Sequence, residues 1–425
     1  MSETKQWDWE PGQKKIPMAD WYKRFGWVEE PYVSPDGERV AAIVNTDEMA
    51  FNVCVNGDTW ERDFDKIWHL RYSASGALSA LISDEGEWTV AIDGTPWENK
   101  FGYVWNPIYS YNGSSVAVAA QQDMRYCMVL NGQAWDQTYA NMTYFALSPC
   151  GTKTAGAVQV VDADSGEIHK FKKGTFTAAF QGKAWDSVFV NVWNLCISPD
   201  AQHLAAEVRL NLYEYTIAVD GQAWDRSFEC VWEPIFDPKD NSVVAPVRIG
   251  GQWQLARNGE LIWETPFVQL WQQCFSPQGD RIAAIVAPRY GRWTVAIDGD
   301  VWQRDFSDMV TDLVFSPDGK RVGALAKEGQ NWYVVVDGTP WDSAFDMAWQ
   351  PVFSPNGEHV AVKVEKNGKF ALALDGHVGS QMADAVWDPV FNSAGDKLLF
   401  KSIQDGTYCR QVLSVDHFRK SATIK

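Results

Sequence analysis

The sequence predicts an all-β fold, a β-propeller of about ten four-stranded blades. A turn motif recurs at a nearly constant interval through the 425 residues, and each interval holds four short segments with the periodicity of strands. A segment near the amino terminus also repeats the pattern of the one strand that the last interval lacks. Four antiparallel strands in about 39 residues are typical of a propeller blade.

The recurring motif is a tetrad that resembles Ser-Pro-Asp-Gly. Its copies begin at Ser34, Ser73, Ser110, Ser148, Ser198, Asp237, Ser276, Ser316, Ser354 and Asn392. Successive copies are 37 to 40 residues apart, except that about 11 additional residues lie between the fourth and fifth copies. Proline at the second position and glycine at the fourth favour a type I turn, so each tetrad predicts a hairpin between a first and a second strand.

The rest of each repeat supplies two further strands. A third apolar segment ends at a turn such as Asp337-Gly338, and a fourth opens with a tryptophan followed four residues later by an aromatic residue, as in Trp341 and Phe345. These segments are too short for helices and have the composition of strands. Each repeat therefore predicts one complete blade.

The tenth repeat ends after its third strand, near Asp416, without a fourth strand of its own. Residues 21–25 carry the fourth-strand pattern, Trp21 and Phe25, before any first strand has occurred. We expect an amino-terminal strand to close the last blade, because this pairs its open sheet edge. The predicted organisation is an amino-terminal extension at residues 1–20 and a single β-propeller at 21–425, with two fused five-bladed propellers as the alternative.

The 23 tryptophans occur mainly at three positions of the repeat. Nine open a fourth strand: Trp21, Trp60, Trp97, Trp135, Trp185, Trp224, Trp263, Trp302 and Trp341. Seven lie five residues before a tetrad, at the entry to the innermost strand: Trp68, Trp105, Trp193, Trp232, Trp271, Trp349 and Trp387. Four lie in a third strand: Trp88, Trp253, Trp293 and Trp332. Because most occupy repeat positions, we expect packing between blades to be their main role.

The seven tryptophans at the innermost-strand entry, here called the inner-entry tryptophans, are the first candidates for partner binding. We expect them on one face, around the mouth of the propeller channel, and tryptophan is enriched at the centres of protein interfaces. The insertion in the fourth repeat, around residues 161–167, is followed by Lys170, Lys172 and Lys173. It falls in the hairpin between the second and third strands, where it forms either a partner-contacting arm or a solvated loop.

The ninth repeat departs from the pattern in its fourth strand. Gly379 and Ala383 replace the tryptophan and the aromatic residue, and Met382 lies beside them. We expect a weak or vacant outer edge in this blade, which is either a docking groove for another chain or a degenerate repeat.

Composition and motifs argue against several classes of function. The net charge of −18 repels nucleic acid, and the chain has neither an amino-terminal signal sequence nor an apolar run long enough to span a membrane. The seven cysteines are scattered without a Cys-x-x-Cys pair, which favours buried, reduced thiols, and we expect a cytoplasmic protein. No motif of a nucleophile, metal site or phosphate loop is present. We expect no catalytic residue, metal or cofactor, with sugar or small-molecule binding or an unrecognised enzyme as alternatives to protein binding.

The motif from Trp349 to Gly357, Trp-x-Pro-x-Phe-Ser-Pro-x-Gly, resembles the WD-like propeller repeat of the TolB family. In size, tryptophan excess, and lack of a signal peptide and of cofactor ligands, the chain is also similar to the soluble tryptophan-rich subunit of the transmembrane redox complex (Tmc) of sulfate-reducing bacteria. That resemblance implies a non-catalytic accessory or scaffold subunit of an electron-transfer complex. It further implies iron–sulfur and cytochrome subunits as partners, and a cytoplasmic location at the inner face of the membrane through those partners, without direct insertion.

Overall fold

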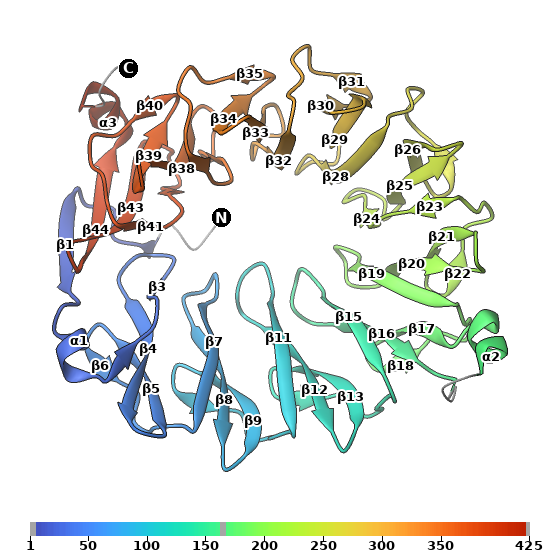
Figure 1. Cartoon of the computed structure of the whole chain (residues 1–425), viewed down its shortest axis with the longest axis horizontal. Helices are drawn as coiled ribbons and strands as arrows, with labels where there is room; N and C mark the ends of the chain where they lie inside the picture. The colour runs from blue at the N-terminus through green and yellow to red at the C-terminus, as the bar shows by residue number, and fades with distance from the viewer. Residues whose placement is uncertain (1–5, 162–166, 422–425) are drawn as a thin grey trace. The chain divides into compact units, whose positions relative to one another are not determined.

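The computed structural model describes residues 6–161 and 167–421, and it consists almost entirely of antiparallel strands. The strands form ten sheets, one for each tetrad, and each sheet is a propeller blade (Figure 1). The predicted ten-bladed β-propeller is therefore confirmed. The chain divides into two compact units, of which unit 1 comprises Met1–Ala41, Val55–Asp58 and Phe267–Lys425 and unit 2 comprises Ala42–Cys54 and Thr59–Pro266.

Unit 2 contains blades 2 to 6, numbered in chain order. Blade 2 comprises β7 (Lys66–Tyr72), β8 (Leu78–Asp84), β9 (Glu87–Ile92) and β10 (Thr95–Pro96), and blade 3 comprises β11 (Tyr103–Tyr109), β12 (Val116–Gln122), β13 (Arg125–Leu130) and β14 (Gln133–Ala134). Blade 4 comprises β15 (Met142–Leu147), β16 (Thr154–Gln159), β17 (Phe176–Phe180) and β18 (Lys183–Ala184), and blade 5 comprises β19 (Asn191–Ile197), β20 (Leu204–Arg209), β21 (Tyr215–Val219) and β22 (Gln222–Ala223). Blade 6 comprises β23 (Cys230–Val231), β24 (Ile235–Phe236), β25 (Val243–Ile249), β26 (Gln252–Arg257) and β27 (Glu260–Leu261).

Unit 1 contains blades 7 to 10. Blade 7 comprises β28 (Gln269–Phe275), β29 (Ile282–Arg289), β30 (Arg292–Ile297) and β31 (Asp300–Val301), and blade 8 comprises β32 (Met309–Phe315), β33 (Val322–Glu328), β34 (Asn331–Val336) and β35 (Thr339–Pro340). Blade 9 comprises β36 (Met347–Ala348), β37 (Val352–Phe353), β38 (Val360–Lys366), β39 (Lys369–Leu374) and β40 (His377–Val378). Blade 10 comprises β41 (Ala385–Val386), β42 (Val390–Phe391), β43 (Lys397–Gln404), β44 (Thr407–Ser414) and β1 (Gly12–Pro17).

Residues of blade 1 belong to both units. Its strands are β2 (Trp27–Val28), β3 (Tyr32–Val33), β4 (Val40–Asp47), β5 (Ala50–Val55) and β6 (Asp58–Thr59). Three short helices complete the elements: α1 (Trp21–Arg24), α2 (Ile168–Lys173) and α3 (Val415–Ser421).

The amino-terminal strand closes blade 10 as predicted, but it is not the segment that carries the tryptophan pattern. Strand β1 pairs antiparallel with β44, from Gly12 opposite Val412 to Pro17 opposite Thr407, and the two strands lie side by side in Figure 1. Trp21 instead begins α1 and is buried, with its indole Nε1 near Gly57 of blade 1. The tryptophan thus keeps the packing position of the repeat, while a segment without the repeat motif supplies the strand.

The fourth-strand tryptophans pack between neighbouring blades. In most blades the regular part of the strand is two residues long and ends just before the tryptophan, and an isolated bridge follows at the aromatic residue, as between Phe51 and Phe64; in blade 6, Ile262 lies between β27 and Trp263. The tryptophan then covers the turn glycine of the next blade: a Cβ atom at Gly94 would lie 3.0 Å from the Trp60 ring. The same contact recurs for Trp97–Gly132, Trp135–Gly182, Trp185–Gly221, Trp224–Gly259, Trp302–Gly338 and Trp341–Gly376. Packing between blades is confirmed as the role of these tryptophans.

The first strands have a recurrent irregularity just after the inner-entry position. Six of them contain a β-bulge, at which one residue has a left-handed backbone, as His69 does with φ of 54°. In blades 1, 6, 9 and 10 the strand is split into two short pieces with a proline between them, as at Pro351. Proline lacks the N–H that the ladder needs, and a bulge likewise leaves one residue unpaired. The β-bulge and the proline therefore both interrupt the first strand at the same position of the repeat.

Candidate functional site

The inner-entry tryptophans pack mainly within their own blades. Each contacts an aromatic ring of the third strand of the same blade. Ring centroids in unit 2 are 4.5 Å apart for Trp68–Trp88, 6.0 Å for Trp105–Tyr126, 6.2 Å for Trp193–Tyr215 and 4.5 Å for Trp232–Trp253. In unit 1 they are 4.4 Å apart for Trp271–Trp293, 5.6 Å for Trp349–Phe370 and 6.0 Å for Trp387–Tyr408. Six of the seven are half-buried, and Trp68 is the one with a large part of its ring in solvent, 43% exposed.

Trp68 belongs to an aromatic cluster that spans blades 2 and 3. Tyr103, 39% exposed, has its ring centroid 6.4 Å from that of Trp68 and 5.5 Å from that of Trp88, and it stacks on Trp105 at 5.8 Å. The sequence prediction missed Tyr103, although Trp27 occupies the same position in the first repeat, seven residues before the tetrad. Tyr103 therefore contacts two of the predicted candidates, the exposed Trp68 and the half-buried Trp105.

A charged residue of the second strand pairs with each of three inner-entry tryptophans; Glu207 and Lys401 are buried, and Lys363 is half-buried. Glu207 pairs with Trp193 in the ladder of blade 5, whereas Lys363 and Lys401 accept the backbone hydrogen bonds of Trp349 and Trp387 at their carbonyls. The corresponding residues of other blades are apolar: Leu81, Ala119 and Ile285. Aligning the ten second strands of the sequence would have revealed these three charges.

Burial shifts the pKa values of these groups. Burial raises the pKa of Glu207 to about 7, although Asn194 donates a 2.8 Å hydrogen bond to its carboxylate, and nearby Glu233 raises it further. Burial lowers the pKa of Lys363, whose ammonium lies 4.2 Å from the centre of the Trp349 ring. The described parts of the chain contain no cluster of three or more potential metal ligands.

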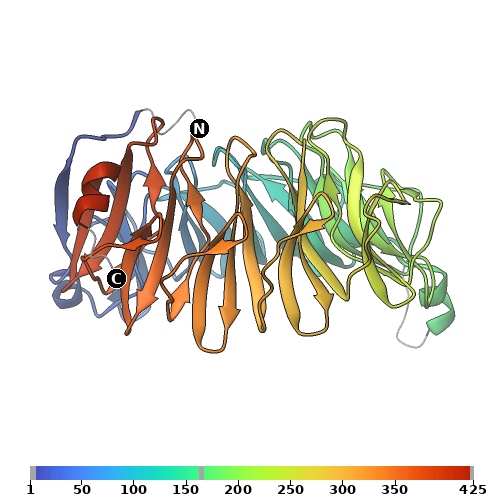
Figure 2. The same cartoon turned by 90° about the horizontal axis from the view of Figure 1, so that it is seen from above.

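The three predicted lysines lie on α2, in the connection between the second and third strands of blade 4. Lys170, Lys172 and Lys173 are exposed, and Lys170 forms an ion pair of 2.8 Å with Glu167. Residues 162–166, the central part of the predicted arm, lie outside the described residues. Helix α2 protrudes beyond the sheet of its blade (Figure 2). Glycine ends it: Gly174 has φ of 102°, and a Cβ atom there would lie 3.0 Å from the backbone of Phe189.

Apolar side chains lie beside Lys172. Phe171 of α2 is 41% exposed, and Leu212 and Tyr213, in the hairpin between β20 and β21 of blade 5, are 48% and 79% exposed. Together with Lys172, Val190 and Asn211 they line a groove of about 320 Å³. We call these residues, with Lys170 and Lys173, the α2 surface. An exposed, contiguous apolar patch with a polar border is typical of an interaction site.

The hairpin of blade 5 is held in place by its own polar contacts. The Arg209 guanidinium donates hydrogen bonds to the carbonyls of Asn211, at 2.9 Å, and Leu212, at 3.0 Å. The Asn211 side chain accepts a 3.0 Å hydrogen bond from the backbone N–H of Tyr213. These bonds fix the backbone that carries the two apolar side chains, so the groove is preformed. The sequence prediction missed this hairpin, although the run Leu210-Asn211-Leu212-Tyr213 stands where other repeats have short turns.

Two predictions about the chain as a whole also have outcomes in the structure. All seven cysteines are free thiols, as expected from their scattered positions, but the expected burial is confirmed only for Cys54, Cys127 and Cys409, and Cys150 is exposed. No helix in the described part of the chain is long and apolar enough to cross a membrane.

Comparison with known proteins gives likenesses of fold alone. No protein-family model matches the chain, and no curated protein matches it. Among solved structures, a crystal structure of the eukaryotic initiation factor is 13% identical with a TM-score of 0.48, covering 77% of this chain and 89% of that one. The β-propeller domain of Cps50 (Swd1) from Myceliophteria thermophila is 13% identical with a TM-score of 0.32, covering 65% and 98%. The Dos1 propeller is 12% identical with a TM-score of 0.35, covering 94% of both. We transfer no function from these structures.

Proposed function

We propose that the protein is a non-catalytic scaffold that binds a partner protein through the α2 surface of unit 2. One observation supports this above the others: Phe171, Leu212 and Tyr213 leave apolar area in solvent around a preformed groove. A protein interface typically has an apolar centre and a polar border, and aromatic residues often dominate its binding energy. The α2 surface has both features.

The charge of the surface indicates the chemistry of the partner. The chain as a whole carries a net charge of −18, but three lysines lie within four residues on α2. Complementary charge guides the encounter of two proteins and fixes their relative orientation. The partner segment is therefore acidic, with at least one apolar side chain that enters the groove beside Phe171.

The resemblance to the tryptophan-rich Tmc subunit supports a more specific proposal about which proteins the partners are. On that ground we infer that the partners are iron–sulfur and cytochrome subunits of a membrane redox complex, which hold the scaffold at the inner face of the membrane. Affinity capture of the tagged chain from its native host in mild detergent, with mass spectrometry, tests this identity. Recovery of iron–sulfur and cytochrome subunits supports this identity of the partners. Recovery of another partner without these subunits overturns it.

Replacing two groove residues tests the binding surface itself. The double variant Phe171→Ser, Leu212→Ser is expected to weaken binding of the purified partner about 30-fold or more, because loss of a central apolar anchor costs about 2 kcal/mol. Reversing the charge with Lys172→Glu and Lys173→Glu is expected mainly to slow association and to reduce its dependence on salt. Surface plasmon resonance at several salt concentrations measures both effects.

A matched control is available in the same kind of hairpin. Met49 and Tyr290 are 79% and 93% exposed in the hairpins between the second and third strands of blades 1 and 7, and Met49→Ser with Tyr290→Ser removes similar apolar area. Full affinity for this control and for wild type, with weak binding by the groove variant, supports the proposal. Equal affinity of all three proteins overturns it.

The aromatic cluster of blades 2 and 3 supports a second candidate function, ligand binding. Trp68 and Tyr103 expose aromatic faces that a sugar or another ring could cover. Quenching or enhancement of tryptophan fluorescence by added sugars, lost in Trp68→Ser, would favour this function. An unchanged spectrum across a sugar panel would leave the cluster as packing.

A further inference from the structure

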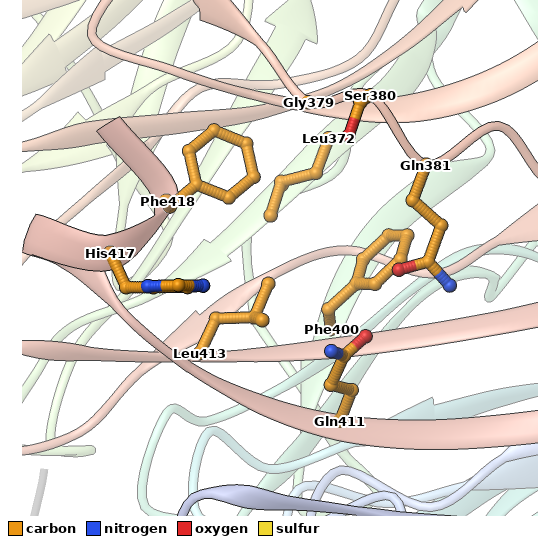
Figure 3. Close-up of a pocket in the computed structure, with 9 residues that line it drawn as sticks. All are labelled: Leu372, Gly379, Ser380, Gln381, Phe400, Gln411, Leu413, His417 and Phe418. Atoms are coloured by element: carbon orange, nitrogen blue, oxygen red, sulfur yellow. The ribbon is translucent and has the colours of Figure 1, made fainter. Parts of the chain in front are cut away.

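The contact between blades 9 and 10 departs from the repeat at its outer end. In most blades a tryptophan covers the turn glycine of the following blade, whereas blade 9 has Gly379 in place of the tryptophan. Phe418 of α3 reaches back, so that a Cβ atom at Gly379 would lie 3.0 Å from the Phe418 ring. A cavity of about 180 Å³ remains there, with Ser380, Gln381 and His417 among its apolar walls (Figure 3). The vacant edge expected from the sequence is thus partly covered by the protein's own α3.

The same contact departs from the repeat a second time, at Lys363 of β38. Lys363 is two residues from Ala361, which packs against blade 10, so both side chains lie on the face toward that blade. It pairs in the ladder with Leu372 of β39, one of the residues that line the cavity in Figure 3. Most other blades have an apolar residue at the position of Lys363, such as Leu81 and Ile285. An amine is unfavourable at a half-buried position, and a residue that breaks the local pattern without a compensating contact indicates a functional site.

The Lys363 amine lies against aromatic rings, and no described residue accepts a hydrogen bond from it. Its Nζ atom is 4.2 Å from the centre of the Trp349 ring and 5.1 Å from that of the Phe370 ring. Lys401, at the same position of blade 10, instead donates a 3.4 Å hydrogen bond to the carbonyl of Pro35. Lys363 is only half-buried, and its Nζ atom keeps contact with solvent. It is therefore an accessible amine that no hydrogen bond or ion pair to a described residue holds.

The surroundings of this amine indicate the chemistry that it can perform. Burial lowers its pKa, although the carboxylates of Asp388, Glu30 and Glu365 oppose the shift. The neutral amine is the nucleophilic form of lysine, and lysines desolvated beside apolar groups form Schiff bases with carbonyl compounds. The three carboxylates disfavour a negatively charged reagent, whereas the two aromatic rings favour contact with an aromatic one.

We propose that Lys363 is a covalent modification site, at which its amine forms an imine with an uncharged aromatic aldehyde. The amine nitrogen attacks the carbonyl carbon, a C=N bond forms, and the carbonyl oxygen leaves as water with the two hydrogens of the amine. The step therefore needs no oxidant or reductant. Lys363 belongs to unit 1 and the α2 surface to unit 2, so this proposal is independent of the proposed scaffold function.

Reductive labelling of the full chain with benzaldehyde and sodium cyanoborohydride tests the proposal, because reduction converts the imine into a stable N-benzyl lysine. Peptide mass spectrometry at low conversion gives a labelling rate for each lysine. In the folded protein we expect Lys363 to react about tenfold faster than Lys320, whose side chain is 81% exposed. In guanidinium chloride the folded environment is lost, and the two rates are expected to agree within about twofold.

Two other aldehydes test the class of reagent. Propanal has no ring and glyoxylate is negatively charged, so each is expected to show less than about a third of the preference of benzaldehyde for Lys363 over Lys320. All rates are compared within the wild-type chain, so misfolding of a variant cannot decide the outcome.

A benzaldehyde reaction at Lys363 that is no faster than that at Lys320 in the folded protein overturns the proposal. A preference that persists in guanidinium chloride also overturns it, because the preference would then come from the local sequence and not from the folded site. An equal preference with propanal or with glyoxylate overturns the assignment of an uncharged aromatic aldehyde.

Discussion

Replacing Tyr408 with alanine is expected to destabilise unit 1 by about 3–5 kcal/mol, the cost of truncating a fully buried aromatic side chain. Tyr408 lies in β44, the strand that joins blade 10 to the amino-terminal β1, and its side chain is completely buried. Its hydroxyl donates a 2.7 Å hydrogen bond to the carbonyl of Gly37 in the first tetrad turn. Its ring also packs against Trp387, with centroids 6.0 Å apart. The Tyr408 side chain thus connects β44 with the first tetrad turn, near the amino terminus.

Two further contacts run alongside this one. Arg410 donates a 2.8 Å hydrogen bond from Nε to the carbonyl of Asp36 and forms a 3.0 Å ion pair with Glu38. Loss of Tyr408 should therefore loosen the first tetrad turn together with β1. Urea unfolding followed by circular dichroism measures the change in stability, and limited proteolysis near residues 6–20 measures the loosening.

Two variants separate packing from hydrogen bonding at this position. Tyr408→Phe keeps the ring but leaves the Gly37 carbonyl without its donor, so we expect a smaller loss of about 1–3 kcal/mol. The control Tyr111→Ala truncates a tyrosine that is 83% exposed and should change stability by less than about 0.5 kcal/mol. A Tyr408→Ala protein as stable as this control would show that the junction of β1, β44 and the first tetrad turn does not hold the blade.

The repeat made the ten blades predictable from the sequence, but it located the closing strand at the wrong segment. Tetrads and turn glycines reflect backbone geometry that few other residues adopt, so they mark each hairpin reliably. Strand β1 satisfies the edge of β44 with backbone hydrogen bonds, which any sequence without an interior proline can supply. Trp21 was identified by its side chain, and the structure uses that side chain for packing, not its backbone for pairing.

The sequence predicted the residues of a candidate surface only where they come from one continuous segment of the chain. The lysines of α2 follow from the insertion in the fourth repeat, whereas the groove also needs Leu212 and Tyr213 from a hairpin in the next blade. Likewise, Gly379 indicated a vacancy in blade 9, but nothing in the repeat indicated that Phe418 would return from α3 to cover it. Contacts between blades arise from the three-dimensional arrangement, and a repeat pattern read along one chain does not contain them.

Lys401 gives the stability of unit 1 a pH dependence that a single substitution should remove. Its side chain is buried in β43, with a 3.4 Å hydrogen bond from Nζ to the carbonyl of Pro35, and burial lowers its pKa to about 8. Arg410 lowers this pKa further, while Asp388 and Asp36 oppose the shift. In the unfolded chain the pKa returns to its ordinary value of about 10.4. Between these two values the unfolded chain binds a proton that the native protein does not, so this lysine's contribution to the free energy of unfolding rises with pH.

Below pH 8 the native protein carries the full cost of a buried ammonium, and Lys401→Met, which keeps the apolar stem, should remove it. We expect the variant to be more stable than wild type by about 3 kcal/mol at pH 7, since each pKa unit corresponds to about 1.4 kcal/mol. This advantage should shrink toward zero as the pH rises from 8 to 10.5, and taking the difference between the two proteins cancels the titration of other groups. Urea unfolding at pH 7, 8.5 and 10 measures it, with Lys320→Met as the control, because the side chain of Lys320 is 81% exposed. A variant that is less stable than wild type at pH 7 would show that the ammonium is stabilised in place by Asp388, Asp36 and the Pro35 carbonyl. An advantage that does not change with pH would show that it does not come from the charge of Lys401.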